Sequence, residues 1–207
     1  MIQQVFPQNF YGLITPPNKD EVLEHIQDVH LTEDQNFGWG SKCIVKRERI
    51  DGIELFHLLK PSFEKFISEL GITCGLRIQD SWRNTYVKGY FQEIHDHLPA
   101  DLSAVLFTND HEEGSGEFYF YNRNSSELTP NWYLNILRDP SYHHVKYKKG
   151  DIIFFPSHML HGVTPYMSDT KRITFALNFE IVFDFDMNHR SPQYQYCLLY
   201  TSPSPRD

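Results

Sequence analysis

Hydrophobic residues recur at helical spacing in two segments of the N-terminal third. In residues 18–30 the apolar positions share one helix face, Asn18 stands at the expected N-cap, and Glu21 completes the spacing of a capping box. A second helix is predicted over Leu55–Leu70, where aromatic and aliphatic residues return every three or four positions and Gly71 follows as a stop. The pattern therefore predicts two amphipathic helices ahead of the main sheet.

After Gly71 the chain changes to short strand-like runs separated by Gly, Asn and Asp. These runs are CGLRIQDSW, TYVKGYF, LSAVLFT, GEFYFYN, HVKYKKGDIIFF and RITFALNFEIVF. Many short strands after two helices predict a mainly β fold with flanking helices. We expect a double-sheet, cupin-like jelly roll with both N-terminal helices packed on one sheet. One domain is expected over residues 1–196, with a helical part at 1–72 and a jelly-roll core at 73–186.

Composition narrows the classes of function. The chain has 207 residues, 40% of them hydrophobic and 15% aromatic, which suits one domain with aromatic-rich strands. A net charge of −8 argues against a basic nucleic-acid groove. No apolar run is long enough for a membrane helix, the start lacks the pattern of a signal peptide, and cysteines are few. We therefore expect a cytoplasmic protein with neither a membrane nor a nucleic acid as its partner.

The last eleven residues, CLLYTSPSPRD (197–207), carry two prolines and no apolar period. They resemble the translation of an adapter used in shotgun DNA sequencing. That resemblance implies a non-native tail, which was never selected to pack against this protein. We expect these residues to be dispensable for folding.

One long polar and aromatic segment, Asn122–His143, interrupts the strand pattern. It is longer than an ordinary hairpin loop, and loops of this length are usually functional or partly helical. With Trp132, Tyr133 and Arg138 it offers both aromatic and charged contacts. The segment is our candidate for a substrate lid.

The stretch FQEIHDHLPADLSAV places two histidines around one acid. On a strand, residues i and i+2 point to the same face, so His95 and His97 are predicted to bind one metal ion while Asp96 points away. A third ligand must come from elsewhere, and KKGDIIFFPSHMLHGV supplies His161 after a buried strand. His158, in the same stretch, is expected to be exposed or to lie behind the ligands.

Three stretches together resemble the Fe(II)/2-oxoglutarate-dependent oxygenases. They are SWRNTYVKGYFQEIHDHLPADLSAVLFTND, GSGEFYFYN and KKGDIIFFPSHMLHGVTPYMSDTKRITFALNFE, which together span about residues 80–180. Within that superfamily they look closest to oxygenases inferred from marine phage and bacterial genomes, which are related to prolyl 4-hydroxylases. The family fold is a double-stranded β-helix, in agreement with the jelly roll that the strand pattern predicts.

The resemblance implies an iron site of the form His-x-Asp/Glu plus a distal His, with positions left for 2-oxoglutarate and dioxygen. Carried across, His95 is the first ligand and His161 the distal one. Position 97 departs from the common pattern, because it is a histidine where the family has a carboxylate. The expected ligands are His95, His97 and His161, which make the site one charge unit more positive. The alternative, in which the backbone turns Asp96 toward the metal, stays open.

The distal carboxylate of 2-oxoglutarate needs a cation, and arginine suits it because its planar fork meets a carboxylate bidentately. Arg172 follows His161 by eleven residues, and the family places a basic residue near this spacing. Thr174, two residues later on the same strand face, is expected to add a hydroxyl. Upstream, Asn84 and Tyr86 match an Asn-x-Tyr pair that contacts 2-oxoglutarate in DNA-dealkylating relatives.

The resemblance implies a non-haem dioxygenase that uses Fe(II), 2-oxoglutarate and dioxygen. Such an enzyme releases succinate and CO2 and hydroxylates a small molecule or a peptidyl residue. The residues themselves leave two rivals: a cupin-like metalloenzyme that does not use 2-oxoglutarate, and a non-catalytic jelly-roll module such as a phage structural protein. Binding of metal and of 2-oxoglutarate separates the three.

Overall fold

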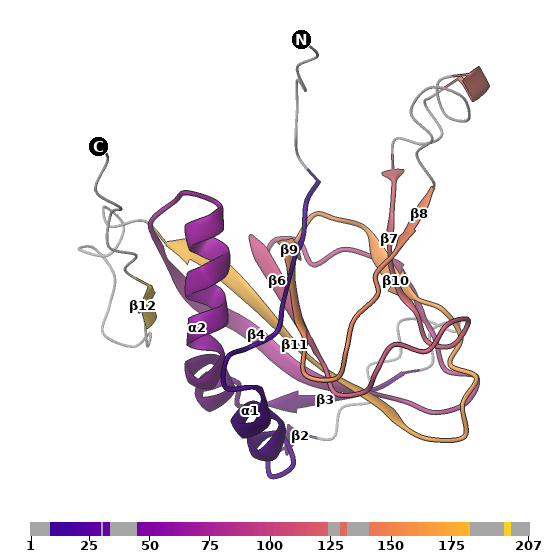
Figure 1. Ribbon diagram of the computed structural model, residues 1–207, viewed down its shortest axis with the longest axis horizontal. Coiled ribbons are helices and arrows are strands. Elements are labelled where there is room, and N and C mark those ends of the chain that lie inside the picture. Colours follow the sequence, from indigo (N-terminus) through magenta and orange to yellow (C-terminus); the bar gives the residue numbers. More distant parts are fainter. Residues whose placement is uncertain are drawn as a thin grey trace.

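The computed structural model shows a two-sheet β fold with two helices on one side (Figure 1). The structure describes the following residues: 9–29, 31–33, 45–123, 129–131, 141–182 and 197–199. Within these ranges no helix is long and apolar enough to cross a membrane.

The larger sheet contains eight strands of the described chain, seven of them in the order β1-β9-β6-β11-β4-β3-β2, while β12 pairs with β4. Their bounds are β1 (Gly12–Ile14), β2 (Leu31–Glu33), β3 (Lys46–Ile50), β4 (Cys74–Tyr86), β6 (Leu102–Phe107), β9 (Ile152–Pro156), β11 (Arg172–Val182) and β12 (Cys197–Leu199). All their pairings are antiparallel. Three N-terminal strands, β1, β2 and β3, thus extend a sheet whose centre comes from later residues.

The smaller sheet has the order β5-β10-β7-β8 in the described part of the chain. Its strands are β5 (Gln92–His95), β7 (Phe118–Tyr121), β8 (Tyr142–His144) and β10 (His161–Val163). In Figure 1 the strands β7, β8 and β10 lie on the side of the molecule away from the helices. The predicted jelly roll is therefore confirmed.

Both predicted helices form, with shifted ends. The first, α1 (Lys19–His25), is shorter than expected, and Asn18 precedes it without capping it by its side chain. The Asn18 amide donates instead to the carbonyl oxygen of Leu58, 3.0 Å away, so it ties α1 to the second helix. That second helix, α2 (Ile53–Glu69), ends before Gly71, which adopts a positive φ of 68° as the stop signal predicts.

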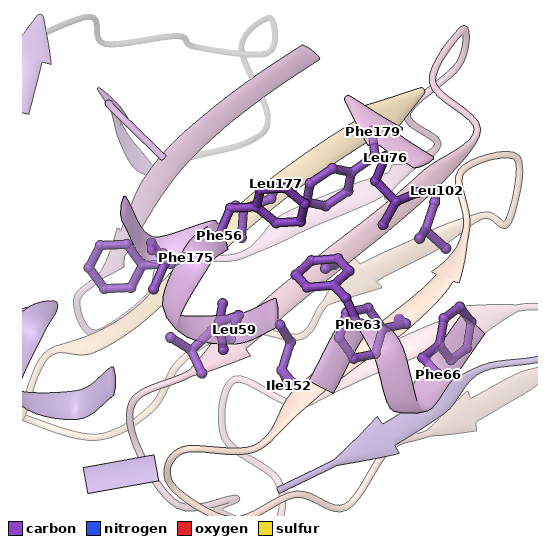
Figure 2. Packing of buried hydrophobic residues seen from close by; sticks show 14 of the residues in the cluster. Phe56, Leu59, Phe63, Phe66, Leu76, Leu102, Ile152, Phe175, Leu177 and Phe179 are labelled. Atoms are coloured by element: carbon purple, nitrogen blue, oxygen red, sulfur yellow. The ribbon is translucent and has the colours of Figure 1, made fainter. Parts of the chain in front are cut away.

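The main hydrophobic core lies between α2 and the larger sheet. Figure 2 shows Phe56 and Phe63 of α2 meeting Phe179 and Leu177 of β11. The Phe63 ring contacts the ring of Phe154 at 4.8 Å and that of Phe179 at 4.8 Å, both edge to face. Such aromatic packing fixes the helix on the sheet and leaves the opposite sheet face for the interior of the barrel.

One predicted pair of strands is in fact a single strand. The runs CGLRIQDSW and TYVKGYF were expected to be separate, but β4 continues without a break to Tyr86. It can run this long because β11 and β3 pair with its two edges. The first three residues of the predicted non-native tail form β12, which pairs with β4 at Leu76 and its neighbours. Residues 200–207 lie outside the described part of the chain.

Candidate active site

Three histidines meet where β5 and β10 pair in the smaller sheet. His95 is the last residue of β5, and it lies opposite His161, the first residue of β10. His97 follows two residues after His95 and joins them from beyond the strand. One nitrogen from each ring lies within 4.8 Å of the other two. The fold thus brings the three predicted ligands together, although His161 lies 64 or more residues after the other two.

The ring nitrogens are arranged as a metal ligand set requires. Nδ1 of His95 donates to the carbonyl oxygen of Glu93 at 2.7 Å, and Nδ1 of His161 to that of Met159 at 2.9 Å. Each bond leaves the Nε2 lone pair for a metal ion. Nε2 of His97 and Nε2 of His161 are 3.1 Å apart. Two nitrogens about 2.1 Å from one ion and at right angles are separated by about 3.0 Å, so this spacing fits.

Burial keeps all three rings neutral. It lowers the pKa of His95 and lowers the pKa of His97 to about 3, with the neighbouring His95 ring as the next cause for His97. Burial also lowers the pKa of His161 well below its usual value, and the charges of the other two histidines add to the effect. A neutral imidazole is the form that binds a metal, so protons compete weakly here.

The position of His97 has a different cause from the one expected. The strand ends at His95, so the i, i+2 rule of a strand does not place His97. Its backbone N–H donates to the carbonyl oxygen of Ser157 at 2.9 Å, and its Nδ1 lies 3.4 Å from the Asn178 amide nitrogen. Asn178 in turn accepts from Ser103 at 2.9 Å. Because the two ends of an amide are assigned from their partners, Asn178 can present either its N–H or its oxygen to His97.

Asp96 lies outside the histidine cluster. Its carboxylate accepts from the backbone N–H of Leu98 at 3.3 Å and lies 3.8 Å from the Arg123 guanidinium. These contacts hold the side chain on the outer side of the turn. The arrangement favours His97 over Asp96 as the second metal-binding residue.

The cluster opens into a pocket that also contains the predicted 2-oxoglutarate contacts. The pocket has about 300 Å³ of empty space, part of it open to solvent. It is lined by Trp82, Asn84, Tyr86, Gln92, His95, His97, Val105, Phe118, His161, Val163, Arg172, Thr174 and Ala176. All seven sequence-predicted site residues are therefore among its walls, contributed by both sheets.

Among the described residues that line the pocket, Arg172 is the one cation, and it is 3% exposed. Its Nε donates to the hydroxyl of Tyr147 at 3.3 Å, and its guanidinium carbon lies 4.7 Å from the Tyr86 ring centre. Both terminal nitrogens are buried and have no hydrogen-bond partner among the described residues. A buried guanidinium without a partner is costly, which is the expected state of a site that receives an anion.

The other predicted contacts lie around Arg172. The Asn84 amide nitrogen is 3.5 Å from the Thr174 hydroxyl, and its oxygen has no partner within the described residues. Tyr86 donates its hydroxyl to Gln92 at 2.8 Å, and the Gln92 amide nitrogen lies 3.2 Å from Nε2 of His95. Gln92 therefore connects the arginine end of the pocket to the histidine end.

Sequence reasoning missed Gln92, Trp82 and the Ser103 link to Asn178. Gln92 had a usable signal, because it lies three residues before His95 on the same short strand. His158 is exposed, as expected. Of the proposed lid, Trp132, Tyr133 and Arg138 lie outside the described residues.

Comparison with known proteins shows which family the central part of the chain resembles. Residues 80–178 match the model of the family described as "Putative 2OG-Fe(II) oxygenase". The match covers just under half of the chain, and it indicates a 2-oxoglutarate-dependent oxygenase. No curated protein matches it. The matched residues run from β4 to β11 and include all three histidines, Arg172 and Thr174.

Solved structures of 2OG-Fe(II) oxygenases share the fold. HygX from Streptomyces hygroscopicus, with nickel and 2-oxoglutarate bound, has a TM-score of 0.58 and 12% identity, over 84% of this chain and 83% of that one. The epimerase SnoN from nogalamycin biosynthesis has a TM-score of 0.65 and 15% identity, over 97% and 95%. A viral collagen prolyl hydroxylase from Paramecium Bursaria Chlorella virus-1 has a TM-score of 0.52 and 14% identity, over 84% of this chain and 97% of that one.

The family match indicates Fe(II), 2-oxoglutarate and dioxygen as the cofactors, and structures of the similar HygX contain 2-oxoglutarate or iron. The residues fit that set, because a neutral three-histidine cluster and a buried arginine without a carboxylate partner lie in one pocket. The histidine cluster suits a divalent cation, and the arginine suits the distal carboxylate of a dicarboxylate.

Proposed function

We propose that this oxygenase is a hydroxylase in which His95, His97 and His161 bind Fe(II) and Arg172 binds the distal carboxylate of 2-oxoglutarate. One observation carries the proposal: the histidine cluster and Arg172, whose terminal nitrogens have no partner among the described residues, line the same pocket. A dicarboxylate bound between them satisfies the two at once. Within the described chain, no other residue satisfies the Arg172 terminal nitrogens, and one nitrogen of each histidine in the cluster lies within 4.8 Å of the other two.

The metal assignment rests on ring geometry. The backbone carbonyl contacts of His95 and His161 fix the tautomer that leaves Nε2 for the ion. His97 completes the set when Asn178 turns its amide oxygen toward Nδ1, so that Nε2 carries the lone pair. Asp96 is engaged with Leu98 and Arg123 and adds no carboxylate.

A neutral histidine at position 97 changes the charge of the centre. Fe(II) with three imidazoles keeps both positive charges, whereas the common triad with one carboxylate keeps one. The site then attracts anionic ligands more strongly. This increases the electrostatic contribution to 2-oxoglutarate binding at the metal end as well as at Arg172.

The cosubstrate assignment rests on unsatisfied groups. Arg172 offers two terminal N–H edges, and the Thr174 hydroxyl and Asn84 amide lie beside it. A carboxylate at this end accepts from all three side chains. Because the three side chains are buried, such charge-assisted bonds contribute about 1.5–3 kcal/mol each.

When bound, iron and 2-oxoglutarate supply the oxidising chemistry: the substrate C–H, dioxygen and 2-oxoglutarate become C–OH, succinate and CO2. The chain binds and orients the reactants and keeps the pocket dry. Related structures include one with hygromycin B bound and one named a collagen prolyl hydroxylase. A small molecule and a peptide are thus both compatible with the fold as the substrate.

An anaerobic titration tests this proposal. Fe(II) is added to the metal-free protein, followed by 2-oxoglutarate, and the visible charge-transfer absorption of the chelate is recorded. We expect one equivalent of each to bind, with the absorption appearing only when both are present. Succinate formation on admission of oxygen would show that the bound pair is competent.

The same titration separates the rival functions. Metal binding without 2-oxoglutarate binding would favour a cupin-like enzyme that uses other chemistry. Failure to bind any divalent ion would favour a non-catalytic jelly-roll module.

The proposal also includes a cytoplasmic location and a single domain over residues 1–196. A proteolysis-resistant fragment of that length would support the single domain.

A further inference from the structure

Gly116 lies against the side chain of Arg172, from a loop that precedes the smaller sheet's strand β7. Its φ of 60° is in the left-handed region, which glycine adopts without strain. Its N–H donates to the carbonyl oxygen of Pro165 at 3.1 Å, and the hydroxyl of Ser115 accepts from the N–H of Met167 at 3.0 Å. These bonds hold the loop against the segment that leads to Arg172.

Position 116 has no room for a side chain. A Cβ atom there would lie 2.8 Å from a ring carbon of Tyr166 and 3.0 Å from Cδ of Arg172, with Nε of Arg172 at 3.5 Å. Non-bonded carbon atoms prefer a separation of about 3.5–4.0 Å, so one of these neighbours would have to move. The arginine therefore lies where it does because residue 116 is a glycine.

Tyr166 is the less movable of the two neighbours. Its N–H donates to the carbonyl oxygen of Tyr90 at 2.8 Å, and its carbonyl oxygen accepts from the N–H of Gly89 at 2.7 Å. Its hydroxyl lies 2.7 Å from that of Thr170, and the residue is buried. The terminal nitrogens of Arg172 have no partner among the described residues. A side chain added to the glycine would therefore displace the arginine first.

Aromatic side chains restrict Arg172 further. Its Nε donates to the hydroxyl of Tyr147 at 3.3 Å, and the Tyr147 ring stacks on that of Phe107 at 3.7 Å with an interplanar angle of 5°. The guanidinium carbon lies 4.7 Å from the centre of the Tyr86 ring. All three rings are buried. The guanidinium cannot advance or withdraw without losing one of these contacts, so its reach into the pocket is fixed.

A fixed cation at one end of the pocket and a histidine cluster at the other define a length. A 2-oxo diacid that occupies both ends has to match that length, because neither end follows the ligand. One methylene group more or less in a closed pocket changes affinity by about 10- to 200-fold. The residues that fix the arginine should therefore decide which diacids bind.

We propose that Gly116 and Tyr147 are positioning residues that fix the reach of Arg172, so that the site selects 2-oxo diacids with a five-carbon chain. This inference rests on the proposed function and deepens it. Both residues lie outside the lining of the pocket and act through the arginine. Their substitution should therefore change the choice between diacids, which loss of stability alone would not do.

Three 2-oxo acids serve as probes in isothermal titrations of the protein loaded with Mn(II), which replaces iron without turnover. 2-Oxoadipate is one methylene longer than 2-oxoglutarate, and 2-oxovalerate has five carbons without the distal carboxylate. We expect the wild type to bind 2-oxoglutarate about 10-fold or more tightly than 2-oxoadipate. Equal affinities for these two diacids in the wild type would overturn the proposal.

Gly116→Ala should weaken 2-oxoglutarate binding by about 10-fold, the lower end of the loss expected for a bidentate charge-assisted contact. The affinities for Mn(II) and for 2-oxovalerate should not change, because neither depends on the arginine. Gly114→Ala is the matched control, since Gly114 has a φ of 74° in the same loop and a Cβ there meets no atom within 4 Å. Equal losses in the two variants would reduce the effect to backbone strain and overturn the role of Gly116.

Tyr147→Phe tests the fixed reach without adding an atom, and it serves if Gly116→Ala does not fold. The ring that stacks on Phe107 is kept, and the hydroxyl that accepts from Nε of Arg172 is removed. We expect the preference for 2-oxoglutarate over 2-oxoadipate to fall severalfold, because the arginine can then adjust to the longer acid. An unchanged preference would contradict the proposal.

The wild type and Arg172→Met separate this inference from the function on which it rests. Failure of the wild type to bind Mn(II) or 2-oxoglutarate would contradict the proposed function, and so would normal 2-oxoglutarate binding by Arg172→Met. If the wild type binds both and Arg172→Met loses 2-oxoglutarate, the proposed function stands. A preference between diacids that survives in Gly116→Ala and in Tyr147→Phe would then show that only the fixed reach is wrong.

Discussion

The two faces of the larger sheet differ in what their buried residues leave unsatisfied. Strand β11 contributes to both: Phe175 and Leu177 point toward α2, while Arg172 and Thr174 line the pocket. All four are buried. On the helix side the rings interlock, as Figure 2 shows. On the pocket side, polar atoms such as the Arg172 terminal nitrogens have no partner in the described chain.

This contrast shows how one strand serves stability and function separately. Alternation along a strand assigns neighbouring residues to opposite faces, so each face can be optimised for one purpose. The apolar face contributes to the free energy of folding through burial and packing. The polar face gives up part of that stability, because buried groups without partners are unfavourable until a ligand binds.

Phe63→Ala should have the largest effect on stability. The ring lies at the centre of the helix–sheet contact, between Phe56, Phe154 and Phe179. Its removal should cost about 3–5 kcal/mol of unfolding free energy, because it leaves a cavity in a packed core. Chemical denaturation measures the change. A loss below about 1 kcal/mol would mean that the helix side does not carry the fold.

On the pocket side, His97→Ala should produce the largest loss of metal affinity. We expect a decrease of more than about 100-fold, since loss of a residue that only supports a ligand already costs 10–100-fold. Asp96→Ala is the matched control and should lose about 10-fold or less, and His97→Asp should still bind metal. Isothermal titration with Mn(II) measures all three. Normal binding by His97→Ala together with loss in Asp96→Ala would reverse the assignment.

Arg172→Met should separate ligand binding from stability. The affinity for 2-oxoglutarate should fall roughly 10- to 150-fold, as expected when a charge-assisted bidentate contact is lost. The unliganded protein should be no less stable, because the change removes a buried charge without a carboxylate partner. Lys171→Met, the exposed neighbour, should change neither quantity. A destabilised Arg172→Met with unchanged affinity would make the arginine structural.

Asn178→Ala tests the support of His97 and should lower metal affinity about 10-fold, up to 100-fold. The Asn178 amide nitrogen lies 3.4 Å from Nδ1 of His97. Asn178→Asp is the rescue variant, because a carboxylate accepts from the Nδ1–H that a metal-bound His97 carries. Titration with Mn(II) compares the two. Equal affinities in Asn178→Ala and wild type would show that Ser157 alone positions His97.

The smallest expected effect is that of deleting residues 197–207. Strand β12 pairs with β4 beside the apolar side of the sheet, yet its sequence resembles a non-native adapter. Thermal unfolding of the truncated chain should give an unchanged melting temperature. A decrease of several degrees in melting temperature corresponds to about 1 kcal/mol or more in a domain of this size. Such a decrease would show that β12 contributes to stability.

Sequence patterns predicted the architecture better than its boundaries. The two helices and the jelly roll follow from periodicity, because α2 buries one continuous apolar face. The unbroken course of β4 and the shortened α1 were missed. Both involve partners distant in sequence: β4 is held by β3 and β11, and the Asn18 amide donates to Leu58 of α2 instead of capping α1.

The site was predictable where chemistry is concentrated in short motifs. His95 and His97 stand out because they are two residues apart, His161 because it directly follows a buried strand and a turn, and Arg172 because of its spacing from His161. Gln92 was missed although it lies three residues before His95, and the contact of Arg47 with Trp82 has no signal in the sequence, since arginine is common on strands. Only the pairing of β3 with β4 brings Arg47 beside Trp82.

A crystal structure with Mn(II) and 2-oxoglutarate tests the central claim most directly. The account predicts one ion bound by the Nε2 atoms of His95, His97 and His161, at about 2.0–2.3 Å. It also predicts that the distal carboxylate of 2-oxoglutarate accepts hydrogen bonds from both terminal nitrogens of Arg172. An ion bound by the Asp96 carboxylate in place of His97, or a 2-oxoglutarate whose distal end lies away from Arg172, would contradict it.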